Sequence, residues 1–244
     1  MSKINEYTEN MKVLGTTLQS SVKSCTCLEQ AAQKWTDLMY QEFSDSIVLS
    51  RVFATIPFGE LPDFNQKFVT TLASSKNITT LLNDDLPVLS LLGSRGRKAA
   101  WNDRRSSQGH IGIPLASADF IESIPMVSRL LKELGVDFAW LKEFDTDIVK
   151  EKIGTISGLF YVPDAPTSVD AKGRKIIAAQ DFVQSNSVKT VFGMGGGYLR
   201  GTIIVMIVFT DEVLEERDIE RFMGLVNYFK SPTQAFVREK KIFV

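Results

Sequence analysis

The segment from Ser187 to Phe209, SVKTVFGMGGGYLRGTIIVMIVF, constrains the fold more than any other part of the chain. Two runs rich in β-branched and aromatic residues flank a glycine-rich stretch, which is the pattern of two strands joined by a turn. The second run is too β-branched to form a helix, so these glycines lack the helix N-terminus that a phosphate-binding loop uses. We therefore predict an antiparallel hairpin whose glycines form a flexible turn with positive φ angles.

Composition places the chain among ordinary folded proteins. Its 244 residues are 44% hydrophobic and 23% charged, with a formal net charge of -1. This balance argues against a dedicated nucleic-acid-binding protein, which normally carries a basic surplus. The longest apolar run, TIIVMIVF, is far shorter than the roughly 20 residues that span a bilayer, and the N-terminus lacks the apolar region of a secretory signal. We expect a cytoplasmic protein with neither a nucleic-acid nor a membrane partner.

Cysteine and histidine usage predicts no metal site and no cofactor. Cys25 and Cys27 are the only cysteines, and a bridge between residues so close together would be strained. The only histidine, His110, lies far downstream. The segment GTISG has the wrong spacing for a hydrolase nucleophile elbow, so no catalytic residues are predicted.

Periodicity predicts helices and strands along most of the chain. Strands are expected at 46–58, 87–92, 110–115 and 157–162, and helices at 27–43, 61–75, 123–135, 146–153, 178–184 and 211–229. The helix at 61–75 should bury Leu61, Phe64, Phe68 and Leu72, and the last helix Ile219, Phe222, Met223, Val226 and Phe229. Residues 1–25 are predicted to be a polar arm or a marginal helix. Residues 26–244 are predicted to form a single α+β domain.

The loop from Gly96 to His110, GRKAAWNDRRSSQGH, gathers the most hydrogen-bonding groups on one connection. Arginine forks suit carboxylate or phosphate groups, and a neighbouring aromatic ring can stack on a ligand. The candidate ligand-binding residues are Trp101, Asn102, Asp103, Arg104, Arg105 and His110. The alternative is a solvated loop whose tryptophan packs against the sheet.

The C-terminal third, SVKTVFGMGGGYLRGTIIVMIVFTDEVLEERDIERFMGLVNYF, resembles the closing hairpin and helix of a GAF domain. Residues 27–43 would be the entry helix of that family and SIVLSRVFATI its first strand, so the resemblance covers about residues 26–230. It implies a central antiparallel sheet of about 5–6 strands with flanking helices, the N- and C-terminal helices packed together. It also implies a ligand pocket on the other face of the sheet, formed by the insertions at 93–109 and 116–157, and a homodimer through the terminal helices.

The chain departs from the family in two respects. The Asn-Lys-…-Phe-…-Asp-Glu string of cyclic-nucleotide-binding members is absent. No cysteine lies in the pocket segments, so neither covalent bilin attachment nor thiol chemistry is expected.

Three functions remain open. The first is a non-catalytic sensory module that binds a small anionic or aromatic ligand and relays its presence through the terminal helices. It predicts that Arg104→Ala or Trp101→Ala abolishes ligand binding with little change in stability, whereas a large loss of stability would mean a structural role. The second is an enzyme of unrecognised type that uses His110 with Asp103 or an arginine. The third is a structural or interaction domain with no ligand.

Overall fold

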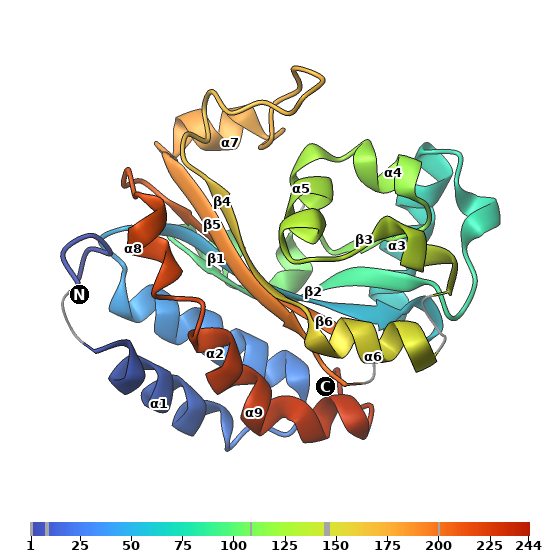
Figure 1. Cartoon of the computed structure of the whole chain (residues 1–244), viewed down its shortest axis with the longest axis horizontal. Helices are drawn as coiled ribbons and strands as arrows, with labels where there is room; N and C mark the ends of the chain where they lie inside the picture. Colours follow the sequence, from blue (N-terminus) through green and yellow to red (C-terminus); the bar gives the residue numbers. More distant parts are fainter. Residues whose placement is uncertain (1, 8–9, 108, 144–146, 200) are drawn as a thin grey trace.

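A six-stranded antiparallel sheet forms the centre of the molecule, in the order β3-β2-β1-β6-β5-β4 (Figure 1). The computed structural model describes residues 2–7, 10–107, 109–143, 147–199 and 201–244. The strands are β1 (Ile47–Pro57), β2 (Pro87–Gly96), β3 (Gly112–Pro114), β4 (Ser157–Val162), β5 (Thr190–Gly197) and β6 (Ile203–Thr210). This sheet and the helices around it confirm the predicted α+β class.

The helices divide between the two faces of the sheet (Figure 1). They are α1 (Met11–Val22), α2 (Leu28–Glu42), α3 (Asp63–Ser75), α4 (Ala118–Glu122), α5 (Pro125–Glu133), α6 (Asp147–Thr155), α7 (Gln180–Ser185), α8 (Glu216–Glu220) and α9 (Leu225–Arg238). α1, α2 and α9 cover one face, which we call the helix layer. α4, α5 and α7 lie over the other face, which we call the cavity face. Thr146, the expected start of α6, lies outside the described residues.

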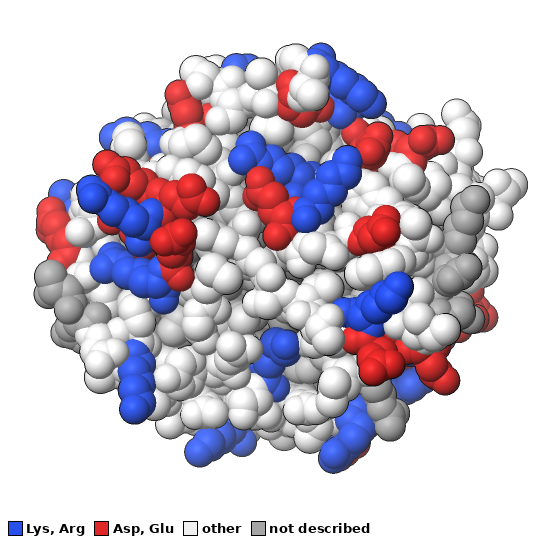
Figure 2. Space-filling model, viewed as in Figure 1, with Lys and Arg blue, Asp and Glu red and all other residues white. Residues whose placement is uncertain are grey.

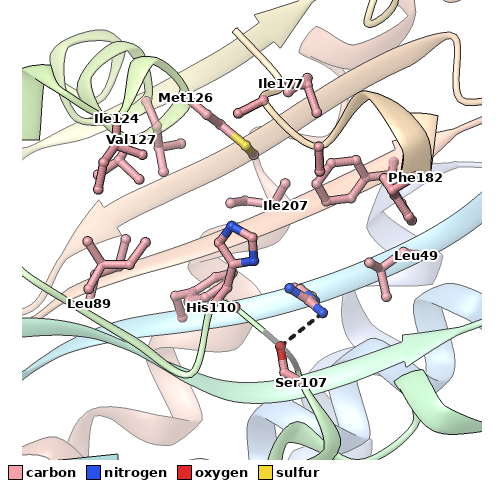
Figure 3. Close-up of a pocket in the computed structure, with 18 of the residues that line it drawn as sticks. Leu49, Leu89, Ser107, His110, Ile124, Met126, Val127, Ile177, Phe182 and Ile207 are labelled. Carbon is pink, nitrogen blue, oxygen red and sulfur yellow. Dashed lines mark hydrogen bonds between the residues drawn. The ribbon is translucent and has the colours of Figure 1, made fainter. Parts of the chain in front are cut away.

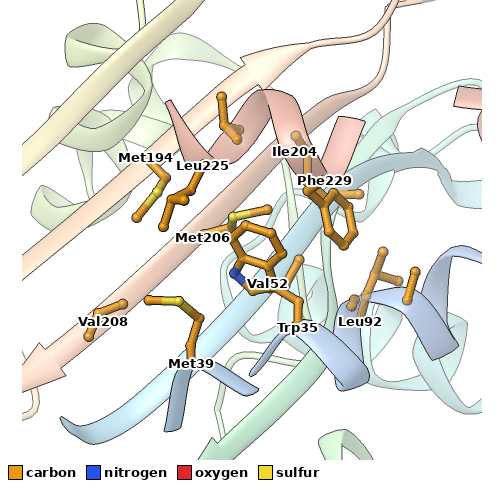
Figure 4. Packing of buried hydrophobic residues seen from close by; sticks show 14 of the residues in the cluster. Trp35, Met39, Val52, Leu92, Met194, Ile204, Met206, Val208, Leu225 and Phe229 are labelled. Carbon is orange, nitrogen blue, oxygen red and sulfur yellow. The ribbon is translucent and has the colours of Figure 1, made fainter. Parts of the chain in front are cut away.

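Large apolar side chains fill the space between the sheet and the helix layer (Figure 4). Trp35 of α2 and Phe229 of α9 meet edge to face, with ring centroids 5.4 Å apart. α1 buries Leu14, Leu18 and Val22 in the same core. Residues 11–22 are therefore a packed helix and not a loose arm, and the terminal helices pack together as predicted.

The predicted hairpin of β5 and β6 is confirmed, with pairs running from Thr190–Thr210 to Gly197–Ile203. The prediction for its glycines was wrong. Gly193, Gly195, Gly196 and Gly197 belong to β5 itself, and the turn follows them, with φ +87° at Gly201. At these glycines, neighbouring atoms occupy the space that a Cβ would need. At Gly197, for example, the Ile153 carbonyl lies there.

Two predicted helix faces also differ from the structure. The last helix is interrupted, so that Met223, between α8 and α9, is 37% exposed. α3 buries Asn65, Val69 and Ala73, while Phe64 is 44% exposed. The Asn65 amide donates to the Ser90 hydroxyl at 3.0 Å, and this buried hydrogen bond turns a polar residue of α3 inward.

Candidate functional site

A partly open cavity of about 730 Å³ lies on the cavity face of the sheet, within the size range of small-molecule sites. Side chains alternate along β1, so Leu49, Arg51 and Phe53 line the cavity while Val52 and Ala54 pack in the helix layer. The opposite wall comes from the start of α5 and from residues 176–182. Most of the lining is apolar, including Leu89, Ile113, Met126, Leu130, Ile177 and Ile207 (Figure 3).

Two of the six predicted ligand-binding residues line this cavity. Trp101 ends a short 3₁₀ helix (Ala99–Trp101), and its ring meets that of Phe182 at 5.5 Å between centroids. His110 lies among Leu89, Ile124 and Met126 (Figure 3). The polar loop therefore reaches the cavity at these two predicted positions, and also at Ala100, Ser106, Ser107 and Gly109.

Asn102, Asp103 and Arg105 do not line the cavity but shape the loop. The Asn102 side-chain oxygen accepts a hydrogen bond from the Gly96 amide at 2.9 Å. The Asp103 carboxylate accepts from the Arg105 amide at 2.8 Å and so caps the second 3₁₀ helix (Arg104–Ser106). The Arg105 side chain is exposed and lies 3.6 Å from the Glu29 carboxylate. The polar groups of these predicted ligand-binding residues bond to the loop and to α2.

Arg104, also predicted to bind a ligand, does not line the cavity. Its buried guanidinium forms an ion pair with Glu29 of α2 and donates to the Asn65 side-chain oxygen at 3.0 Å. The Phe243 ring lies 5.1 Å from it. Arg104 thus joins the loop to the helix layer, whereas Trp101 of the same loop belongs to the cavity.

Arg51, which the sequence analysis did not single out, carries the charge among the described residues that line the cavity. It lies in the middle of β1, a central strand, and donates from Nη2 to the Ser107 hydroxyl at 3.2 Å, the dashed line in Figure 3. Burial lowers its pKa to about 10. One signal in the sequence pointed to it: a single arginine within the apolar strand IVLSRVFATI, since charged residues are rarely buried without a purpose.

His110 is neutral at pH 7. Its surface is open to the cavity, yet protein atoms displace much of the water around the imidazole, and Arg51 adds its positive charge. Burial and, second, the Arg51 charge lower the pKa of His110 from the ordinary 6.5 to about 4. A neutral imidazole can donate a hydrogen bond to an anion. Unlike an imidazolium, it does not repel the neighbouring Arg51 guanidinium.

This shift predicts a pH dependence of stability. Because the pKa is lower in the folded than in the unfolded chain, the unfolded chain binds more protons as the pH falls from about 6.5 to 4. Because the imidazole is partly exposed to solvent, water screens this effect. We therefore expect the free energy of unfolding to fall by about 1 kcal/mol from pH 7 to pH 5. Urea unfolding of the wild type and His110→Asn at both pH values measures it. A loss equally large in the variant would contradict this assignment.

A second hollow of about 680 Å³ lies beside α6 and the C-terminal segment. Its lining carries charges of both signs, including Asp147, Lys150, Glu151 and Arg238. Lys240 there already forms an ion pair with Glu60. Because charges of opposite sign lie close together here, this hollow offers a charged ligand fewer free partners than the cavity beside Arg51 does.

The surface and the helices of the described residues add little to this picture. On the face shown in Figure 2, acidic and basic side chains are interspersed. Within the described ranges, no helix has the length and apolar character needed to cross a bilayer. Nor do the described residues bring three or more histidine, cysteine or acidic side chains together as a metal site would require.

Comparison with known proteins yields likenesses among solved structures alone. Neither a family model nor a curated protein matches the sequence. The chain is similar to the phycocyanobilin-bound GAF domain of a cyanobacterial phytochrome, with a TM-score of 0.49 and 10% identity over 96% of this chain and 98% of that one. The fold resembles that of GAF domains.

Two further solved structures are similar. Free methionine-R-sulfoxide reductase from Neisseria meningitidis has a TM-score of 0.48 and 11% identity, over 96% of both chains. The GAF domain of Acinetobacter phosphoenolpyruvate-protein phosphotransferase has a TM-score of 0.44 and 10% identity, over 97% of this chain and 98% of that one. At such identities the likeness concerns the fold and carries nothing about the ligand.

Proposed function

We propose that this chain is a cytoplasmic, non-catalytic sensory module that binds a small molecule in the cavity beside β1 and relays its presence to the terminal helices. The observation that supports this most is the cavity of about 730 Å³, which has mainly apolar walls and a few polar groups. That combination is typical of small-molecule sites, in which apolar walls provide affinity and a few polar groups fix orientation.

The loop between β2 and β3 supplies a physical route for the relay. Trp101 of this loop lines the cavity, and Arg104 of the same loop pairs with Glu29 in the first turn of α2. The Glu29 carboxylate also accepts a hydrogen bond from the Val244 amide at 3.1 Å. A ligand that moves Trp101 would therefore shift contacts of both α2 and the C-terminus. This requires that the ligand binds two conformations of the loop with different affinities.

Binding is favoured over turnover by the surroundings of His110. The enzyme hypothesis paired this imidazole with Asp103 or an arginine. The Asp103 carboxylate caps a 3₁₀ helix instead, and the arginine near the imidazole, Arg51, is a cation and not a base. Among the described residues that line the cavity, none is an aspartate or a glutamate that could orient the imidazole as a base.

A neutral fluorescent probe, 1-pyrenebutanol, tests the proposed function. We expect one molecule to bind per chain, and Met126→Trp, which places a bulky ring in the cavity, to weaken binding at least about tenfold. Met223→Trp, at an exposed position between α8 and α9, is the matched control and should leave the affinity unchanged. Hydrogen exchange of residues 239–244 should change when the probe binds. If the probe does not bind, the hypothesis of a domain without a ligand is favoured. If it binds but hydrogen exchange of residues 239–244 does not change, the proposed relay is contradicted.

The homodimer through the terminal helices remains part of the proposal. α1 and α9 lie on the outside of the helix layer, where the side chain of Val13 is 56% exposed. Light scattering should give a mass near twice 27.2 kDa, and a mass of 27.2 kDa would contradict it.

A further inference from the structure

Arg51 is an uncompensated charge within the cavity. Its Nη2 donates to the Ser107 hydroxyl, while its Nε is buried and has no hydrogen-bond partner. Among the described lining residues, no aspartate or glutamate balances it, and no lysine accompanies it. The other polar groups nearby are neutral: serine hydroxyls and the imidazole of His110.

Packing of this face of the sheet does not require an arginine at position 51, whose side chain instead makes a hydrogen bond to Ser107. The neighbours of Arg51 on the same face of β1, Leu49 and Phe53, are apolar and buried, and an aliphatic side chain at position 51 would continue their packing. Removing an arginine from water without an anionic partner costs free energy, and burial correspondingly lowers its pKa. Costly buried charges that do not serve packing are typical of functional sites.

The remaining donors of Arg51 suit one anionic group. A guanidinium has five N–H donors in a planar fork that matches the oxygens of a carboxylate. In the same cavity, the rings of Trp101, Phe182 and Phe209 follow one another, with centroid separations of 5.5 and 5.4 Å. A second negative charge would find no cation among the described lining residues.

We propose that the cavity binds an organic monoanion with an apolar, ring-bearing body, its anionic group held by Arg51 beside Ser107 and His110. The body lies against the aromatic series and the aliphatic wall. This inference rests on the proposed function and names the chemical class of its ligand.

A matched pair of probes tests the proposal: 1-pyrenebutyrate, a monoanion, and 1-pyrenebutanol, its neutral counterpart. We expect wild type to bind the butyrate about 10- to 100-fold more tightly than the butanol, the range of a charge-assisted hydrogen-bond pair. Arg51→Gln should lose this preference, with a larger loss of affinity for the butyrate than for the butanol. Arg51→Lys should keep part of it. Arg217→Gln, at an exposed position outside the cavity, is the control that should keep all of it.

A second measurement needs no variant. The chain contains a single histidine, so NMR reports the His110 imidazole without ambiguity. A carboxylate held beside it favours the imidazolium, so the butyrate should raise the pKa of His110 from about 4, whereas the butanol should not.

The outcomes separate this inference from the proposed function. Equal affinities for the two probes in wild type, or a preference that survives in Arg51→Gln, would overturn the anion site and leave small-molecule binding standing. An unchanged His110 pKa in the butyrate complex would likewise overturn it. If neither probe binds wild type, both proposals fail together.

Discussion

Replacing Arg104 by alanine is expected to lower the free energy of unfolding by about 3 to 5 kcal/mol, the range for breaking a buried ion pair from one side. The guanidinium is 5% exposed and contacts Glu29, Asn65 and the Phe243 ring. Without it, the Glu29 carboxylate stays buried, with the Val244 amide and the more distant Arg105 as its remaining polar neighbours. Urea unfolding at pH 7 measures the loss.

Two comparison variants make this result specific. Arg217→Ala removes an exposed ion pair with Glu215, and we expect a change of less than about 0.5 kcal/mol. Adding Glu29→Gln to Arg104→Ala should recover part of the lost stability, because a neutral amide is easier to bury than a carboxylate. A fully stable Arg104→Ala variant that no longer binds 1-pyrenebutanol would restore the first expectation, that Arg104 contacts the ligand.

Gly197→Ala is expected to cost about 3 kcal/mol or more, at the upper end for overpacking a core. A methyl group at this end of β5 would overlap the carbonyl group of Ile153 in α6. The carbonyl belongs to the backbone and a Cβ has no rotamers, so no side-chain rearrangement relieves the overlap. α6 must move away from the sheet, which thermal melting and hydrogen exchange in residues 147–155 would detect.

Gly224→Ala is the matched control for this substitution. Gly224 has φ -61° and ψ -24°, and no atom lies within 4 Å of an added Cβ. We expect it to be neutral or to stabilise the chain by up to about 1 kcal/mol, through the lower entropy of the unfolded state. Equal effects at Gly197 and Gly224 would show that the close approach to α6 is unimportant.

Much of the fold could be predicted from local pattern. The β-branched and aromatic residues of IVLSRVFATI and TIIVMIVF indicate strands, and the stripe containing Trp35 and Met39 indicates α2. The glycines of β5 were misassigned, because a glycine in a turn and a glycine under a packed helix look alike in sequence. What distinguishes them is the position of Ile153, which is distant along the chain.

Two of the six predicted site residues line the cavity, and the others do not for a similar reason. The loop from Gly96 to His110 was identified by its concentration of polar groups, and Trp101 and His110 do line the cavity. Its arginines drew attention because they are adjacent in sequence, yet Arg104 is paired with Glu29 of α2. The arginine that lines the cavity is Arg51 on β1, and the lack of a hydrogen-bond partner for its Nε appears only in the folded structure.

The sequence by itself determined the antiparallel hairpin, the amphipathic helices and the balanced charge, because side-chain periodicity and residue type act over a few neighbouring positions. Tertiary structure alone decided which arginine is neutralised and which faces an apolar cavity. Ion pairing and desolvation depend on groups that meet in space, such as Glu29 with Arg104, and the spacing of residues along the chain does not encode those meetings.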